Sequence, residues 1–295
     1  MCVYSIKDLE QLSGIKAHTL RIWEQRFNII SPNRTDTNIR LYSDDDLKLV
    51  LNISLLKDNG YKISKIVKMS EEEMRTEAIK LTEKKLTYPE QIQALTLAMI
   101  EMDEQRFEKI MASNILQLGF EKTMINVVFP FFQRIGILWQ TGSISPAHEH
   151  FVSHLVRQKL MVAIDGQYHM ITDHSKKFLL FLPEEETHEL TLLFSSYIIK
   201  VRKHHPIYLG PDSPLEAIKS IYDVHKPDYL LSIATSAPGL SQIQNYVNKL
   251  SELTPDATVL LSGFQIVGQE LKRPSNVIFM NHFEDLISFV EDINN

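Results

Sequence analysis

The sequence predicts a multidomain chain of α and α/β class: a winged helix-turn-helix head, a four-helix bundle and a doubly wound, Rossmann-like parallel sheet. The apolar period changes twice along the chain. Short helices around a polar insert give way to long helices, and these give way to short apolar runs that alternate with helices. A length of 295 residues predicts two domains or one large one. We expect domains over residues 1–70, 71–170 and 176–295.

Charge is divided unevenly between the head and the rest of the chain. Residues 1–70 hold 11 lysines and arginines against 8 acidic residues, whereas the remaining 225 hold 20 against 29. A basic head on an acidic body indicates a small nucleic-acid module joined to another kind of domain. With 44% apolar and 23% charged residues, the composition is that of a folded protein rather than a disordered one.

The sequence also excludes several classes of protein. No segment reaches the about 18 uninterrupted apolar residues of a membrane helix, and the N-terminus lacks the pattern of a secretory signal. Cys2 is the only cysteine, which excludes an internal disulfide framework and a metal site built from several thiolates. We therefore expect a cytoplasmic protein with no membrane partner.

Two short helices and a hairpin account for most of the head. Ser5 is a suitable N-cap for a helix over residues 7–12, Gly14 ends that helix, and a second helix over residues 16–25 follows a very short turn. Turn-forming residues and a short alternating run between positions 28 and 42 predict a hairpin or wing. Further helices are expected over residues 43–60 and 64–69.

Long helical periods follow the head, and alternating elements follow these helices. A connector helix and a four-helix bundle are expected over residues 72–84, 89–101, 103–118, 121–139 and 145–164. Strands are expected over residues 178–182, 207–209, 229–233, 258–261 and 277–280, with helices over 188–202, 214–225, 237–252 and 284–293. Ligands of such sheets bind beyond the carboxyl ends of the strands, which directs attention to the loops there.

The second helix of a helix-turn-helix enters the major groove, and its first turns contact bases and phosphates. A wing adds contacts to the phosphate backbone that fix the register. We predict DNA contacts from the helix and wing residues Lys16, His18, Thr19, Arg21, Arg34, Asn38, Arg40 and Tyr42. The alternative is that these side chains form a solvated face.

The head carries motifs in a characteristic order and spacing. These are Tyr4-Ser5-Ile6-Lys7-Asp8-Leu9, Gly14-Ile15, Thr19-Leu20-Arg21-Ile22-Trp23-Glu24, Pro32-x-Arg34 and Asn38-Ile39-Arg40-Leu41-Tyr42. Together they resemble the winged-helix head of MerR-family transcriptional regulators. The resemblance implies a dimer that binds a pseudo-palindromic operator in double-stranded DNA.

Two constellations in the rest of the chain suggest chemistry. Glu186-x-His188 lies at the end of the first strand, where a carboxylate can hold one ring nitrogen and make the other a better metal ligand. Trp139 is followed after nine residues by Glu149-His150, a spacing that can surround one cavity. The alternatives are a solvated loop histidine, a core tryptophan and a surface Glu-His pair. The nearby His148, His150 and His154 lack a clear further ligand set for a metal.

With Tyr208-Leu209-Gly210-x3-Pro214, these motifs resemble the cobalamin-binding unit of light-sensing MerR regulators of the CarH type. The resemblance implies that His188 binds the cobalt of adenosylcobalamin from below and that Glu186 tunes it. It also implies that Ser232, Ser262 and Gly263 line the nucleotide tail, and that Trp139, Glu149 and His150 cap the adenosyl group. In such proteins light breaks the cobalt–carbon bond, the oligomer falls apart and DNA is released, so the expected partner is a second copy in a homodimer or homotetramer.

The sequence departs from that pattern at several positions. Thr191 stands where glycine is expected, Ala234 where leucine is expected, Ser262 where glycine is expected, and Gln140 where histidine follows the tryptophan in light-responsive members. A second hypothesis is therefore a regulator whose degenerate domain acts through protein contacts without cobalamin. A corrinoid-dependent enzyme is the remote alternative, because a substrate barrel of about 250 residues is missing. We expect no enzymatic activity.

Overall fold

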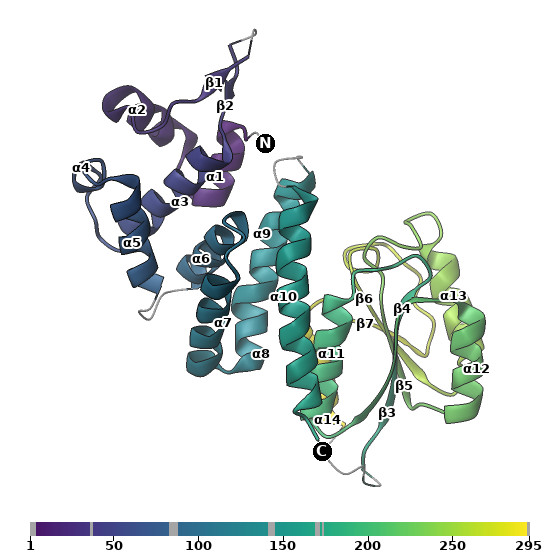
Figure 1. Ribbon diagram of the computed structural model, residues 1–295. Coiled ribbons are helices and arrows are strands. Elements are labelled where there is room, and N and C mark those ends of the chain that lie inside the picture. Colours follow the sequence, from purple (N-terminus) through teal and green to yellow (C-terminus); the bar gives the residue numbers. More distant parts are fainter. Residues whose placement is uncertain are drawn as a thin grey trace. The chain divides into compact units, whose positions relative to one another are not determined.

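The computed structural model describes residues 4–35, 38–82, 88–140, 145–168, 172 and 174–293 (Figure 1). The chain divides into two compact units, Met1–Leu155 and Val156–Asn295. The first unit contains the head and most of the long helices, and the second contains the sheet. No helix of the described residues is long and apolar enough to cross a membrane.

The head has the predicted helix-turn-helix and hairpin. Its elements are α1 (Ile6–Ser13), α2 (Ala17–Phe27), β1 (Asn33–Arg34), β2 (Arg40–Leu41), α3 (Asp44–Asp58) and α4 (Ile63–Ile66). Ser5 and Asp8 form a capping box at the start of α1, and Ser43 and Asp46 form another at the start of α3. Gly14 ends α1 in the left-handed conformation, with a φ of 74°, which sets the short turn into α2.

The next helices are α5 (Glu71–Thr82), α6 (Tyr88–Ile100), α7 (Glu104–Leu118), α8 (Phe120–Thr123), the π-helical turn η1 (Met124–Val128), α9 (Phe129–Gln140) and α10 (Pro146–Asp165). The single helix predicted over residues 121–139 is therefore wrong in one respect. Within η1 the chain widens, and the amide of Phe129 donates to the carbonyl of Met124. Pro130 follows directly, and a proline ring crowds the carbonyl four residues earlier in a regular α-helix, so a wider turn accommodates it.

Hydrogen bonds join the head to the helices that follow it. The side chain of Gln93 on α6 donates to the carbonyl of Leu51 on α3 at 2.9 Å, and both residues are buried. Arg134 on α9 donates to the carbonyl of Leu12 at the end of α1. Burial lowers the pKa of this arginine. The head is thus fixed to α6 and α9 by polar groups as well as by apolar packing.

The second unit alternates strands and helices as predicted. Its elements are β3 (Lys177–Pro183), α11 (Leu190–Val201), β4 (His205–Ser213), α12 (Leu215–His225), β5 (Tyr229–Ile233), α13 (Ile243–Leu253), β6 (Thr258–Ser262), β7 (Val277–Phe279) and α14 (Phe283–Asp292). In the described residues the strands form one parallel sheet in the order β4-β3-β5-β6-β7. Helices α12 and α13 cover one face, and α11 and α14 cover the other (Figure 1).

The strand order places the site. The sheet grows outward from β3 in both directions, so the loops after β3 and β5 part at the carboxyl edge and leave a crevice between them. Helix α11 begins at Leu190 and α13 at Ile243, later than the predicted starts at 188 and 237. His188 and residues 237–242 therefore belong to the loops around this crevice.

Candidate functional sites

Glu186 is a charged residue with no exposed surface, although it lies in the loop after β3. Its Oε1 accepts hydrogen bonds from the amides of Thr187 at 3.0 Å and of His188 at 3.1 Å. The same oxygen lies 2.5 Å from Nδ1 of the His188 ring. The loop thus folds around its own carboxylate and fixes the ring of the following histidine.

The loop after β5 holds the same carboxylate from the other side of the crevice. The amides of Thr235, Ser236 and Ala237 donate to Oε2 of Glu186 at 2.8, 2.5 and 3.1 Å. The hydroxyl of Ser236 donates to it as well, at 3.2 Å. Glu186 therefore links two loops whose strands are neighbours in the sheet but lie about fifty residues apart in sequence.

These hydrogen bonds determine the ionisation state of Glu186. Burial alone would raise its pKa, but hydrogen bonds from the His188 ring and from backbone amides outweigh burial and hold the pKa well below its ordinary value. An ionised carboxylate can accept a hydrogen bond from Nδ1–H of His188 but cannot donate one. The ring proton is thereby placed on Nδ1 and the lone pair on Nε2, the state in which imidazole binds a metal.

The residue after His188 carries a second carboxylate, which is held by two partners. Glu189 is 9% exposed, and its side chain pairs with Arg157 of α10 at 2.6 Å. It also accepts a hydrogen bond from the hydroxyl of Tyr208 on β4 at 3.0 Å. Burial, and then the Glu189 charge, raise the pKa of Tyr208. The Arg157–Glu189 pair could not be predicted from the sequence, because its partners lie on different elements.

Thr191, where glycine was expected, lies in the first turn of α11.

The positions expected to line a nucleotide tail have partners within the chain. Ser232 is completely buried on β5, and its hydroxyl lies 3.2 Å from the hydroxyl of Tyr246 on α13. Ser262 is half-buried, and its carbonyl accepts the amide of Ala234 at 2.8 Å. A Cβ placed on Gly263 would lie 2.3 Å from the carbonyl oxygen of Ala234, so this glycine is required by backbone packing.

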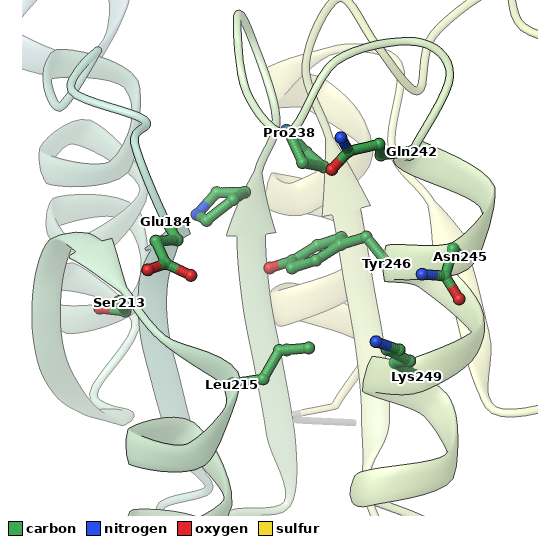
Figure 2. Close-up of a pocket in the computed structure, with 9 residues that line it drawn as sticks. Glu184, Ser213, Leu215, Pro238, Gln242, Asn245, Tyr246 and Lys249 are labelled. Atoms are coloured by element: carbon green, nitrogen blue, oxygen red, sulfur yellow. The ribbon is translucent and has the colours of Figure 1, made fainter.

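A pocket of about 210 Å³ opens beside the same crevice (Figure 2). Pro183 and Glu184 line it from the end of β3, and Pro238 lines it from the loop after β5. The ring of Tyr246 reaches from α13 across the pocket toward Glu184 (Figure 2). The pocket is smaller than the roughly 300–1,000 Å³ that is usual for small-molecule sites.

The predicted cap motif is only partly described. Trp139 lies near the end of α9, but its side chain is outside the described part of the structure, as are residues 141–144. Glu149 and His150 lie in the first turns of α10, where Glu149 accepts a hydrogen bond from Ser153 at 2.5 Å. His150 is exposed, with its Nε2 3.7 Å from a Glu149 oxygen. Among the described residues, no three histidine, cysteine or acidic side chains cluster as metal ligands.

The predicted contacts on α2 lie at or near its surface. Lys16, His18 and Arg21 are exposed, and Thr19 is half-buried. Lys16 pairs with Glu10 at 3.1 Å, and the His18 ring lies 3.3 Å from the Thr19 hydroxyl. The start of the recognition helix thus presents polar and basic groups to solvent.

The predicted contacts of the wing are organised by Glu24, a residue to which sequence reasoning gave no role. Both oxygens of Glu24 accept from Nε of Arg40, at 2.8 and 3.2 Å, and Arg34 lies 3.6 Å from the same carboxylate. Arg34 also donates to Asn38 at 2.7 Å. The carboxylate therefore joins the recognition helix to the wing.

Tyr42 requires a correction to its predicted place. Its side chain is 1% exposed, and its backbone pairs with that of Tyr4. A ring in this position packs in the core of the head and does not reach a phosphate. Tyr42 was predicted as a phosphate contact because it follows the wing residues in sequence, but its ring is buried in the head together with that of Tyr4.

Comparison with known proteins decides what these parts are. Residues 4–73 match the family model described as MerR HTH family regulatory protein, and residues 91–163 match the model described as B12 binding domain. The chain joins a MerR-family head to a B12-binding domain. The predicted fold class, a winged helix-turn-helix, a helical bundle and a Rossmann-like sheet, is confirmed.

Two relatives that match most of this chain are named as transcriptional repressors. The repressor CarH of Myxococcus xanthus is 24% identical over 85% of this chain and 85% of its own length. The repressor CarA of the same organism is 24% identical over 76% of this chain and 73% of its own length. The monomethylamine corrinoid protein of Methanosarcina barkeri shares the fold, with a TM-score of 0.56 and 11% identity over 70% of this chain and 100% of that chain.

Proposed function

We propose that this protein is a DNA-binding transcriptional regulator that binds adenosylcobalamin and changes its oligomeric state with that ligand. The observation that carries the proposal is the pair formed by Glu186 and His188. A buried, ionised carboxylate holds Nδ1 of an exposed imidazole at 2.5 Å, at the crevice where sheets of this order bind ligands. This donor set fits a cobalt ion approached from one side.

The chain's own residues would divide the work at that site. His188 would hold the cobalt through Nε2, while Glu186 would keep the proton on Nδ1 and fix the ring. The amides of the loop after β5 keep Glu186 ionised. A bound adenosylcobalamin would supply a cobalt–carbon bond that light can break. Glu149, His150 and Trp139 are proposed to cover the upper ligand.

The head would bind an operator as one half of a symmetric pair. Lys16, His18, Thr19 and Arg21 are proposed to contact DNA from α2, and Arg34, Asn38 and Arg40 from the wing. A dimer or a dimer of dimers places two heads on successive half-sites, which is how the oligomeric state would control binding. The named relatives are repressors, which favours regulation over catalysis for this chain.

A regulator that works without cobalamin is the second candidate, and the internal bond between Ser232 and Tyr246 favours it. One measurement distinguishes the two candidate functions. The full chain is expressed with adenosylcobalamin in the dark and passed through gel filtration. Cobalt-type visible absorbance that elutes with the protein supports the first candidate, and its absence supports the second.

Ligation by His188 is tested by His188→Ala in the same experiment. We expect this variant to lose cobalamin bound with its own nucleotide base off the cobalt, because the substitution removes the imidazole that would bind the cobalt. His225→Ala, at an exposed histidine of α12, serves as the matched control and should bind as the unchanged protein does. Retained affinity with an unchanged spectrum in His188→Ala would contradict the assigned role.

A further inference from the structure

Tyr246 occupies the space in front of Ser232. Its hydroxyl lies 3.2 Å from the Ser232 hydroxyl, and its ring is 8% exposed within the apolar core between α13 and the sheet. Ser232 has no exposed surface. Any ligand group that approached the Ser232 hydroxyl would first have to displace this ring from the core.

The pocket in front of the Tyr246 ring is too small for a nucleotide. The pocket beside Tyr246 has a volume of about 210 Å³ and ends at the Tyr246 ring rather than at β5 (Figure 2). A nucleotide, with a base, a sugar and a phosphate, needs a site in the usual range of roughly 300 Å³ or more.

Gly263 offers no additional room. Its Cβ position is filled by the backbone of Ala234, with the carbonyl oxygen of Ala234 only 2.3 Å from it. The amide of Gln265 donates to that same oxygen at 3.0 Å, so the loops after β5 and β6 are closed on each other. The Ala234 backbone thus occupies the space that a side chain at position 263 would fill, so no room remains there for a ligand.

The structure therefore fits the cobalt-binding end of a cobalamin and does not fit its nucleotide end. We propose that Tyr246 closes the nucleotide groove, so that this chain holds a corrinoid through His188 while the nucleotide stays outside the sheet domain. This inference rests on the proposed function. It changes the expected ligand class, because corrinoids that lack the nucleotide should bind as well as complete cobalamins.

The test compares two probes on the full-length chain. Hydroxocobalamin carries the nucleotide and diaquacobinamide lacks it, and both dissociation constants follow from visible absorbance titrations. The unchanged protein should bind cobinamide at least as tightly as cobalamin, because no nucleotide base competes with His188 for the cobalt. Tyr246→Ala should shift the ratio of the two constants toward cobalamin by about tenfold or more, because the groove opens to Ser232.

Control variants distinguish the effect of the space that the Tyr246 ring fills from the effect of its hydrogen bond to Ser232. Tyr246→Phe keeps the ring and removes the hydroxyl, so its ratio should match that of the unchanged protein. Tyr246→Leu serves if the alanine variant does not fold, and thermal unfolding checks each variant. His188→Ala should lose both probes.

Each remaining outcome has a definite meaning. A preference of the unchanged protein for cobalamin by more than about tenfold overturns the closed groove and leaves the proposed function standing. An unchanged ratio in folded Tyr246→Ala and Tyr246→Leu has the same consequence. Failure of the unchanged protein to bind either probe overturns the proposed function, and this inference with it.

Discussion

At the scale of single residues, the molecule depends on carboxylates that bind more than one partner. Glu186 accepts hydrogen bonds from two loops, and Glu24 holds two arginines of the wing. Each of these acidic side chains lies beside a predicted binding residue and determines where that residue points. Replacing either carboxylate should therefore alter the neighbouring binding site, even though every predicted binding residue is still present.

Glu186→Gln should destabilise the protein by about 2 kcal/mol at neutral pH, because hydrogen bonds to a charged acceptor become bonds to a neutral one. Because the folded pKa lies below the ordinary value of 4.5, the carboxylate contributes its full stability above that value and loses it as the pH falls. Urea unfolding at several pH values measures the difference between wild type and variant. That difference should shrink on acidification.

Glu185→Gln provides the control for this titration, because its side chain is exposed next to Glu186 in the sequence. It should change the urea midpoint little at any pH. A gap between Glu186→Gln and wild type that stayed constant from neutral to acid pH would contradict an ionised, hydrogen-bonded Glu186.

Arg40→Ala should weaken binding to all duplex sequences alike and reduce the slope of log affinity against log salt by about one. The substitution removes the proposed phosphate contact and also leaves Glu24 without the Nε–H that both of its oxygens accept. Fluorescence anisotropy over a range of salt concentrations gives the slope. Lys219→Ala on α12 is a charge-matched control, and an unchanged slope in Arg40→Ala would argue against the phosphate contact.

At the scale of elements, the site is made by loops that parallel strands bring together. The loops after β3, β5 and β6 meet at one edge of the sheet, where Glu186 joins the first two and Ala234 and Gly263 join the last two. Helix ends contribute as well, since Tyr246 reaches the crevice from α13. The rigidity of this edge depends on a few close backbone approaches.

Gly263→Ala should destabilise the sheet domain by more than about 3 kcal/mol, because the new Cβ meets the Ala234 backbone and φ is +105°. Gly268→Ala is the matched control: its φ is +76°, but nothing lies within 4 Å of the added carbon. We expect it to cost about 1 kcal/mol, for the left-handed backbone alone. Urea unfolding of both variants compares them, and equal losses would show that the contact with Ala234 is absent.

At the scale of the whole molecule, regulation requires that ligand state and DNA binding change together. The head is tied to α6 and α9 of the first unit by Gln93 and Arg134, so a rearrangement of those helices would be transmitted to the head. The basic head and acidic remainder also suit a protein in which one part alone touches DNA.

Adenosylcobalamin in the dark should give an oligomer that binds a duplex selected from a random pool, and illumination should lower both the oligomer mass and the affinity. The physical reason is that binding of one head raises the effective concentration of the linked second head at its half-site. The oligomer therefore binds more tightly than a single head does. Light scattering after gel filtration gives the mass, and anisotropy gives the affinity. Unchanged mass and affinity after illumination would exclude light control while leaving cobalamin binding intact.

Features set by neighbours in sequence were predictable. The caps formed by Ser5 with Asp8 and by Ser43 with Asp46 involve residues three positions apart. The strands of the sheet appear as apolar runs close to their observed bounds, except that β4 extends well beyond the predicted residues 207–209 at both ends. The proximity of Glu186 to His188 was also predictable, since only two residues separate them. Such features depend on local spacing, which a sequence displays directly.

Features set by distant contacts were not predictable in the same way. The spacing of residues gives no sign that Thr235 would bind Glu186, that Glu24 would hold Arg40, or that Tyr246 would meet Ser232. Tyr246 shows in the sequence only as one apolar position of a helix. The burial of Tyr42, whose backbone pairs with that of the distant Tyr4, is likewise absent from the local pattern.

By itself, the sequence determined the order and class of the elements, the basic head, and the Glu-x-His pair at the end of a strand, because these follow from local period, composition and spacing. The tertiary structure alone decided that Glu186 is buried and ionised, that the wing is tied to its helix, and that a tyrosine fills the space in front of Ser232. The reason is that burial and long-range hydrogen bonds arise only when strands and helices distant in sequence pack together.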